Sequence, residues 1–258
     1  MAASLLDLCS EDRLMLKLSN VLPPLPRYGW HAVPRNPKVL LVNKIHVNTP
    51  SPLSVSSLPY PNTPLIGAAV AHVKPQLRPE TYSHSLRVYY YGMSLLQTQF
   101  ASWLSEGWID AETWLLTCLF HDIGTTAGNL SGTNLSFDFW GGIHALATLH
   151  DLGAPTAQAE SVCEAVLRHQ DPGETGTISC LGMLIQLATE FDNMGHYCDM
   201  VHEGTIEAVV HEWPRMGWSG CFAKTIREEI ALKPWAHSTA IDGFAEMVEG
   251  NEVMKKYD

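Results

Sequence analysis

Apolar residues recur at three- and four-residue spacing along most of the chain from about Leu65 onward, which is the spacing of amphipathic helices. Gly, Pro and Asp residues separate these stretches, and convincing period-two runs that would indicate strands are absent from the sequence. The pattern therefore predicts an all-α body. We expect its helices over residues 80–104, 110–124, 138–152, 156–169, 178–194, 205–213, 219–232 and 241–255.

Residues 20–64 differ from the body because they hold most of the prolines, set among small polar residues. Proline fixes the backbone angle φ and removes a hydrogen-bond donor, so this density predicts an extended arm without regular helix. We therefore divide the chain into a proline-rich N-terminal extension, residues 1–64, and a helical domain, residues 65–258. Because such an arm can reach a neighbouring subunit, we expect a homo-oligomer.

Composition and charge narrow the class of function. The 258 residues are 46% hydrophobic and 17% charged, which is neither a disordered nor a coiled-coil composition. With 27 acidic and 16 basic residues the net charge is -11, and the average field repels phosphate backbones and anionic membranes. We therefore expect no nucleic-acid partner and no membrane partner. The first 18 residues alternate Leu with charged residues, unlike a signal peptide, so we expect a cytoplasmic protein.

Histidine and carboxylate residues supply the candidate chemistry. His84, the adjacent pair His121 and Asp122, and Asp192 each lie near an inward-facing position of a different predicted helix. Imidazole and carboxylate groups bind borderline divalent cations, and helices of a bundle can direct such ligands towards one ion. Taken singly, each residue is better explained as an isolated buried or surface polar group; taken together, they predict a metal site. The six cysteines lack paired spacing and predict neither disulfides nor a Cys-ligated zinc ion.

The motifs around these residues resemble one known family. The run LFHDIGT, residues 119–125, resembles the defining motif of the HD-domain metal-dependent hydrolases, and the first histidine lies within ETYSHSLRV, residues 80–88. Together with SFDFWGGI (136–143), RHQD (168–171), LGMLIQLATEFDNMG (181–195) and KPWAHST (233–239), these runs look like the fungal cyanamide hydratases. The similarity covers about residues 28–258. It implies an HD-domain helical bundle and a hydro-lyase that adds water to the nitrile of cyanamide to give urea.

The resemblance also implies a metal centre. It makes one zinc ion the expected cofactor, although these donors also suit Fe²⁺. Water bound to such an ion has a pKa lowered towards about 7 and can attack the nitrile carbon; alternatively, the metal polarises the nitrile nitrogen and an outer water attacks. The expected metal ligands are His84, His121, Asp122 and Asp192.

Two further roles are expected around this centre. Asp122 is the predicted proton shuttle, and His169 is a predicted catalytic group that faces the substrate. Asn193 and Thr125 adjoin ligands, and we predict that they bind the amino group of the small neutral substrate.

Other functions stay open at this point. The same site could hydrate another small nitrile or an isocyanide, or the metal could stabilise a module without enzymatic activity. An HD-type phosphohydrolase would need a phosphate-binding arginine, and we expect Arg87 to form a salt bridge instead. If His144 and His169 both face inward, they could bind a second metal, as in the dinuclear HD phosphodiesterases and di-iron oxygenases.

Overall fold

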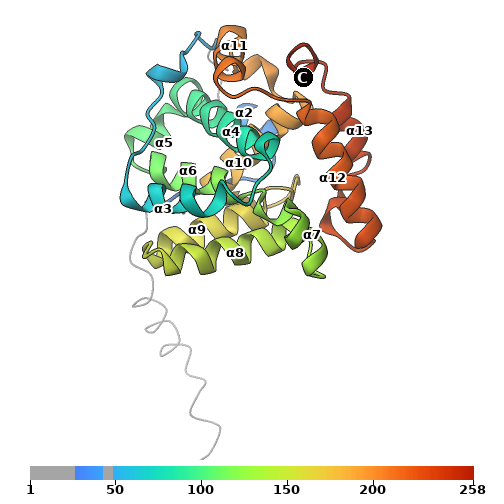
Figure 1. The fold of residues 1–258 in the computed structure, drawn as a ribbon. Helices are drawn as coiled ribbons and strands as arrows, with labels where there is room; N and C mark the ends of the chain where they lie inside the picture. Colours follow the sequence, from blue (N-terminus) through green and yellow to red (C-terminus); the bar gives the residue numbers. More distant parts are fainter. Residues whose placement is uncertain (1–26, 43–48) are drawn as a thin grey trace, which may run out of the picture.

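The computed structural model describes residues 27–42 and 49–258, and the statements below concern these residues. The prediction of an all-α body is confirmed, since helices make up almost all of the regular structure (Figure 1). The α-helices are α2 (Pro37–Val42), α3 (Pro64–Val73), α4 (Pro79–Thr98), α5 (Ala101–Ser105), α6 (Ala111–Phe120), α7 (Ala127–Gly132), α8 (Phe137–Asp151), α9 (Thr156–Leu167), α10 (Cys180–Met194), α11 (Glu203–Glu212), α12 (Trp218–Leu232) and α13 (Phe244–Glu249).

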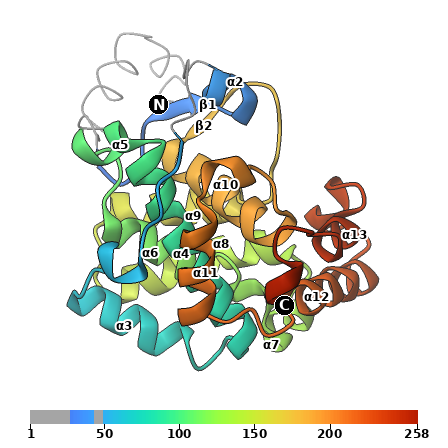
Figure 2. The ribbon, with the colours of Figure 1, turned by 90° about the horizontal axis from the view of Figure 1, so that it is seen from above.

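The helices α4 and α10 lie in the middle of the molecule, where they pack against each other (Figure 2). Pro79 opens α4 at a position where its missing N–H group is not needed. The side-chain oxygen of Ser179 accepts a hydrogen bond from the Gly182 N–H at the start of α10, and Gly195, with a φ of 74°, ends that helix. These local signals fix where each central helix begins or ends, and thereby which residues face its neighbours.

The outer helices cover the central pair on different sides. Helices α8 and α9 pack against each other as a pair, and α12 and α13 lie together at another side of the bundle (Figure 1). The α12 and α13 region has a hydrophobic cluster of its own, which includes Trp218, Phe222 and Phe244 together with Phe137 from α8. The bundle therefore has a large core around α4 and α10 and a smaller core beneath α12 and α13.

Several predictions about secondary structure are wrong. The expected absence of strands is contradicted by a small antiparallel sheet, in which β1 (Ala32–Pro34) pairs with β2 (Thr177–Ser179). Each strand has three residues, which is too short to show a period-two pattern. The expected arm without helix contains α2, because Pro37 stands at its first position, where proline is tolerated. The rest of the predicted extension lies partly in residues 1–26 and 43–48, outside the described residues.

The expected helix over residues 80–104 is two helices, α4 and α5. The backbone leaves the helical conformation at Phe100, with φ of -125° and ψ of 39°, and its ring stacks on Trp103. The last expected helix, over residues 241–255, is reduced to α13 and is followed by the short 3₁₀ helix η6 (Lys255–Tyr257). The five described cysteines are free, as expected, and Cys9 lies outside the described residues.

A close approach between α4 and α6 gives a test of this packing. A Cβ atom built at Gly92 would lie 2.1 Å from Cζ2 of Trp114, whose indole is fully buried and donates to the Tyr89 carbonyl. We expect Gly92→Ala to lower the free energy of unfolding by about 1–3 kcal/mol, since the indole has no free space to move into. Urea unfolding measures this change.

Gly67→Ala is the matched control, because a Cβ atom at Gly67 of α3 would meet nothing within 4 Å. We expect that variant to gain about 0.5–1 kcal/mol, since alanine favours the helix over glycine. Equal effects of the two substitutions would contradict the packing described for α4 and α6.

Candidate metal centre

Three elements bring the predicted histidine and aspartate ligands together. His84 lies in the second turn of α4, and His121 and Asp122 occupy the turn that joins α6 to the 3₁₀ helix η3 (Ile123–Thr125). Asp110 caps the start of α6 by accepting the Thr113 N–H at 2.8 Å. The side chains of His84, His121 and Asp122 are at most 1% exposed, so their polar atoms must find partners inside the protein.

These three residues form a triangle of ligand atoms. The Nε2 atoms of His84 and His121 are 3.1 Å apart, and Oδ2 of Asp122 lies 3.6 Å and 3.4 Å from them, respectively. Two ligands of a tetrahedral zinc ion, each bonded at about 2.0–2.1 Å, are separated by about 3.3 Å. The triangle therefore has the dimensions of three ligands of one ion, and among the described residues these three side chains form a group that could hold a metal ion.

The hydrogen bonds at the other ring nitrogens show how the histidines are oriented. Nδ1 of His121 donates to the Cys118 carbonyl at 2.8 Å, and Nδ1 of His84 lies 2.6 Å from Oδ2 of Asp192. A proton on each Nδ1 leaves each Nε2 with a lone pair directed into the triangle, beside a carboxylate oxygen. The electron pairs on the two Nε2 atoms and the carboxylate oxygen repel one another in this buried site. A divalent cation bound to all three atoms would replace this repulsion by attraction.

The pKa values of His121 and Asp122 agree with a place that favours positive charge, whereas His84 is neutral. Burial lowers the pKa of His84 to about 4, so its imidazole is neutral at pH 7. Burial alone would also lower the pKa of His121 and raise that of Asp122. The attraction between the two side chains reverses both effects, and the pKa of His121 is raised while that of Asp122 is lowered. Neither carboxylate oxygen of Asp122 has a hydrogen-bond partner among the described residues, which suits a metal ligand.

Asp192, the fourth expected ligand, lies on the other side of the His84 ring. Its carboxylate accepts hydrogen bonds from Nε and Nη2 of Arg87 and from Nη1 of Arg215, at 2.8–3.1 Å, in addition to its contact with His84. All three charged side chains are fully buried. The structure therefore confirms the expected salt bridge of Arg87 and places the Asp192 carboxylate among cations, outside the triangle of ligand atoms. Sequence reasoning missed Arg215, which stands in a segment without helical pattern between α11 and α12.

His169 lies just beyond α9 and faces the triangle. Its Nδ1 donates to the Val166 carbonyl at 2.7 Å, and its Nε2 lies 3.9 Å from Oδ1 of Asp122. This Nε2 atom is buried and has no hydrogen-bond partner among the described residues. Burial and the neighbouring His121 lower the pKa of His169, so it is a neutral acceptor beside the candidate metal centre.

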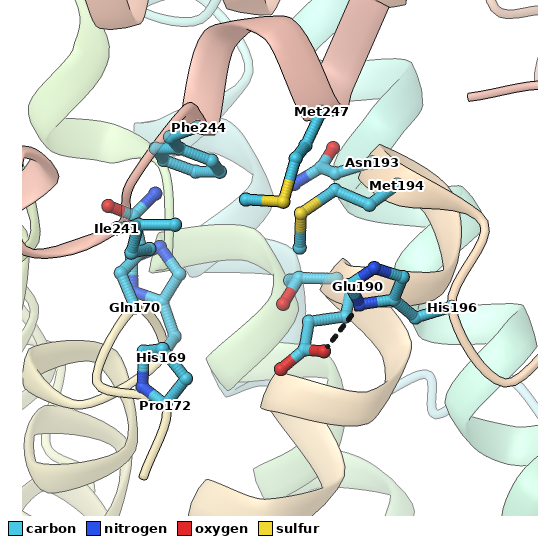
Figure 3. A pocket seen from close by; sticks show the side chains of 11 residues that line it. His169, Gln170, Pro172, Glu190, Asn193, Met194, His196, Ile241, Phe244 and Met247 are labelled. Carbon is cyan, nitrogen blue, oxygen red and sulfur yellow. Dashed lines mark hydrogen bonds and ion pairs between the residues drawn. The ribbon is translucent and has the colours of Figure 1, made fainter. Parts of the chain in front are cut away.

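The two predicted substrate-binding residues, Thr125 and Asn193, differ in the hydrogen bonds that they form near the site. Oγ1 of Thr125 donates to the Asp122 carbonyl at 2.7 Å, so its donor is used within the turn that carries the ligands. Oδ1 of Asn193 accepts from Nε1 of Trp218, whose ring stacks on His84 with centroids 4.2 Å apart. Asn193 and His169 both line a pocket of about 230 Å³ next to the triangle (Figure 3).

Gly124 supports the ligand turn by a close approach to α8. A Cβ atom at Gly124 would lie 2.0 Å from the Phe137 carbonyl oxygen, so only glycine allows η3 to pack against the start of α8. Nδ2 of Asn129 also donates to the Ile123 carbonyl at 2.8 Å. The backbone that carries His121 and Asp122 is therefore held by a neighbouring helix and by a side-chain hydrogen bond.

His144 does not lie with these residues. Its Nε2 atom is 3.1 Å from Nε2 of His72 on α3, and the two half-buried rings stack with centroids 5.3 Å apart. This contact between α3 and α8 directs Nε2 of His144 towards His72, and His144 does not belong to the group of described residues that could hold a metal ion. The described residues thus offer no geometric support for the two-metal alternative.

Comparisons with known proteins agree with the geometry. Residues 81–194 match the model of the HD domain, a range that contains all four expected ligands. The chain is 35% identical over 227 residues to each of two proteins of Saccharomyces cerevisiae, cyanamide hydratase DDI2 and cyanamide hydratase DDI3. The aligned region covers 87% of this chain and 96% of each yeast protein.

The match to the yeast proteins covers 227 residues and so extends well beyond residues 81–194, the range of the HD domain. In residues 27–42 and 49–258, no helix combines the length and apolar character needed to cross a membrane. The ordered motifs, the bundle and the triangle of ligand atoms now have a common explanation, because the chain belongs to the cyanamide hydratase family of HD-domain proteins.

Proposed function

We propose that this protein hydrates the nitrile of cyanamide to urea with one zinc ion held by His84, His121 and Asp122. The observation that carries the proposal is the buried triangle of two imidazole Nε2 atoms and one carboxylate oxygen, 3.1–3.6 Å apart, in a chain related to proteins named cyanamide hydratase. Two neutral imidazoles and one carboxylate are a ligand set that suits zinc. A bound zinc ion would supply a nucleophile at neutral pH by lowering the pKa of water to about 7.

In this proposal Asp122 transfers the proton that the hydration requires, and His169 binds the substrate. A C–O bond forms at the nitrile carbon, the triple bond opens, and both hydrogens of the water end on the former nitrile nitrogen. Oδ1 of Asp122, which has no hydrogen-bond partner among the described residues, can accept a proton from the water and return it to that nitrogen. Nε2 of His169, a neutral acceptor 3.9 Å from that oxygen, can hold the amino group of cyanamide.

The arginines near the centre support a neutral substrate over a phosphate ester. Phosphoryl transfer needs cationic groups that contact the transferred phosphoryl oxygens. Arg87 and Arg215 both donate to Asp192, and Arg168 pairs with Glu164 and Asp171. These guanidinium groups therefore pair with carboxylates of the protein and are not available to a phosphoryl group. A small neutral nitrile needs no such cationic partner.

Asp192 has a different role in this proposal from the one expected from the sequence. It orients His84 by accepting the proton on Nδ1, which leaves Nε2 of that ring free to bind the metal. Thr125 has a related role, because its hydroxyl fixes the turn of Asp122. Asn193 stays a predicted contact for the amino group of the substrate, and the homo-oligomer and the cytoplasmic location stay predictions from the sequence.

The reaction itself is tested with the purified protein. We expect urea to form from cyanamide, the activity to disappear when the metal is stripped, and zinc to restore it. Colorimetric detection of urea with metal analysis of the same samples measures both quantities. A folded protein with one zinc ion per chain that forms no urea would overturn the proposed function.

Substitutions separate the roles of the ligands. We expect Asp122→Asn to reduce kcat by at least about 100-fold, because the amide cannot accept a proton. His84→Ala should lose zinc as well as activity. His72→Ala removes a half-buried histidine of the α3–α8 contact and is the control that should retain both. An active Asp122→Asn protein would rule out the proton transfer assigned to this residue.

Asp192→Asn tests whether this carboxylate orients His84 or binds the metal. We expect one zinc ion still to bind, with an affinity reduced about 10–100-fold, because an amide orients the imidazole less strongly than a carboxylate. Asp138→Asn is the control, since Asp138 is also buried and pairs with a histidine, His237, at 2.5 Å. Competition with a chelator measures both affinities, and circular dichroism shows whether each variant is folded.

Asp192→Asn also removes the negative charge that balances two buried arginines, and this loss could itself disturb the site. A second measurement therefore uses the unmodified protein. Nitrogen-15 NMR of the zinc-loaded protein should show a proton on Nδ1 of His84. An Nδ1 without a proton, or a zinc affinity of Asp192→Asn equal to that of the unmodified protein, would contradict the orienting role.

A further inference from the structure

The pocket beside the candidate metal centre is larger than the proposed substrate. It has a volume of about 230 Å³ and lies between the end of α10, the segment after α9 and helix α13 (Figure 3). Cyanamide has three non-hydrogen atoms and fills roughly the space of two water molecules, about 60 Å³. Most of the pocket would therefore remain unused by cyanamide itself.

The pocket adjoins the reacting groups through two side chains. His169, whose Nε2 faces Asp122, forms one part of its wall. Asn193 forms another part and accepts a hydrogen bond from the indole that stacks on His84. A molecule whose nitrile reaches the metal centre past His169 would direct the rest of its structure into this space.

The wall beyond these two residues is mainly apolar. Met194 from α10 and Ile241, Phe244 and Met247 from the α13 region face one another across the pocket (Figure 3). Methionine side chains adapt to the shape of a bound group and make favourable contacts with aromatic rings. An apolar cavity of about 150 Å³ is sufficient to hold benzene, so this pocket can accept a group of that size.

One polar group in the wall lacks a partner. Gln170 is 5% exposed, and its Oε1 has no hydrogen-bond partner among the described residues. A buried amide oxygen without a partner is unfavourable, and a ligand that donates a hydrogen bond to it would remove that penalty. Gln170 follows His169 directly and lines the same pocket.

We propose that the pocket binds the apolar substituent of monosubstituted cyanamides, R–NH–C≡N, and that the protein hydrates them to substituted ureas, R–NH–CO–NH₂. This inference rests on the proposed function. One water is added: its oxygen forms a bond to the nitrile carbon, the triple bond opens, and both hydrogens end on the former nitrile nitrogen. The substituent lies among the methionines and Phe244, and the substrate N–H donates to Oε1 of Gln170.

Activity on two substrates tests the proposal with the zinc-loaded full chain. We expect phenylcyanamide to be converted to phenylurea, measured by liquid chromatography, with kcat/KM within tenfold of that for cyanamide. Met247→Trp should lower the ratio of kcat/KM for phenylcyanamide to that for cyanamide at least tenfold, because the indole fills the pocket. Leu232→Trp adds the same bulk at an exposed position of α12 and should leave the ratio unchanged.

Binding of the product gives a measurement that does not depend on turnover. We expect the metal-stripped protein to bind phenylurea at least tenfold more tightly than urea in calorimetric titrations, and both Met247→Trp and Gln170→Ala to weaken that binding. Hydration of cyanamide without hydration of phenylcyanamide would overturn the inference and leave the proposed function intact. Failure with both substrates in a zinc-loaded protein would overturn the proposed function, and equal binding of urea and phenylurea would overturn the use of the pocket.

Discussion

The contact between Asp192 and its two arginines is the interaction on which the arrangement of the centre depends. A carboxylate without exposure to water is stable only with nearby positive charge, and Arg87 of α4 and Arg215 of the segment before α12 supply it. Arg215 also donates to the Asp192 carbonyl and to Asp258, and Asn251 donates to the same carbonyl. One residue of α10 thus joins α4, the segment before α12 and the C-terminal residues.

This network explains why His84 can serve a metal although it lies deep in the core. The histidine is held between the Asp192 carboxylate at Nδ1 and the triangle at Nε2, and the indole of Trp218 covers its face. Since burial lowers the pKa of His84 to about 4, the ring stays neutral over the pH range in which metal ligands must lack competing protons. The arginines therefore influence the metal centre through an intermediate carboxylate, without contact with the ligand atoms themselves.

The sequence was sufficient for the helical class and for the residues that gather at the centre. Adjacent His121 and Asp122 at a helix end and an inward-facing His84 each follow from periodicity and capping, which are local properties. The position of Asp192 relative to the His84 ring does not follow from such local properties. It depends on Arg215, which is 23 residues away in a non-helical segment and donates to the Asp192 carboxylate. The strands β1 and β2 were not predicted for a related reason, because the pairing of three-residue segments depends on partners far along the chain.

That small sheet has a consequence for how the chain folds. Hydrogen bonds near this sheet join residues that are separated by 127 to 151 positions along the sequence. Examples are the bonds of Cys180 with Gly29 and of Trp30 with Ala157. Closing so large a loop has an entropic penalty that must be met before the contacts form, whereas helix pairs such as α8 and α9 need only short loops. The helical bundle would therefore assemble first, and the segment that carries β1 would attach last, as a late step in the folding kinetics with little influence on the early transition state.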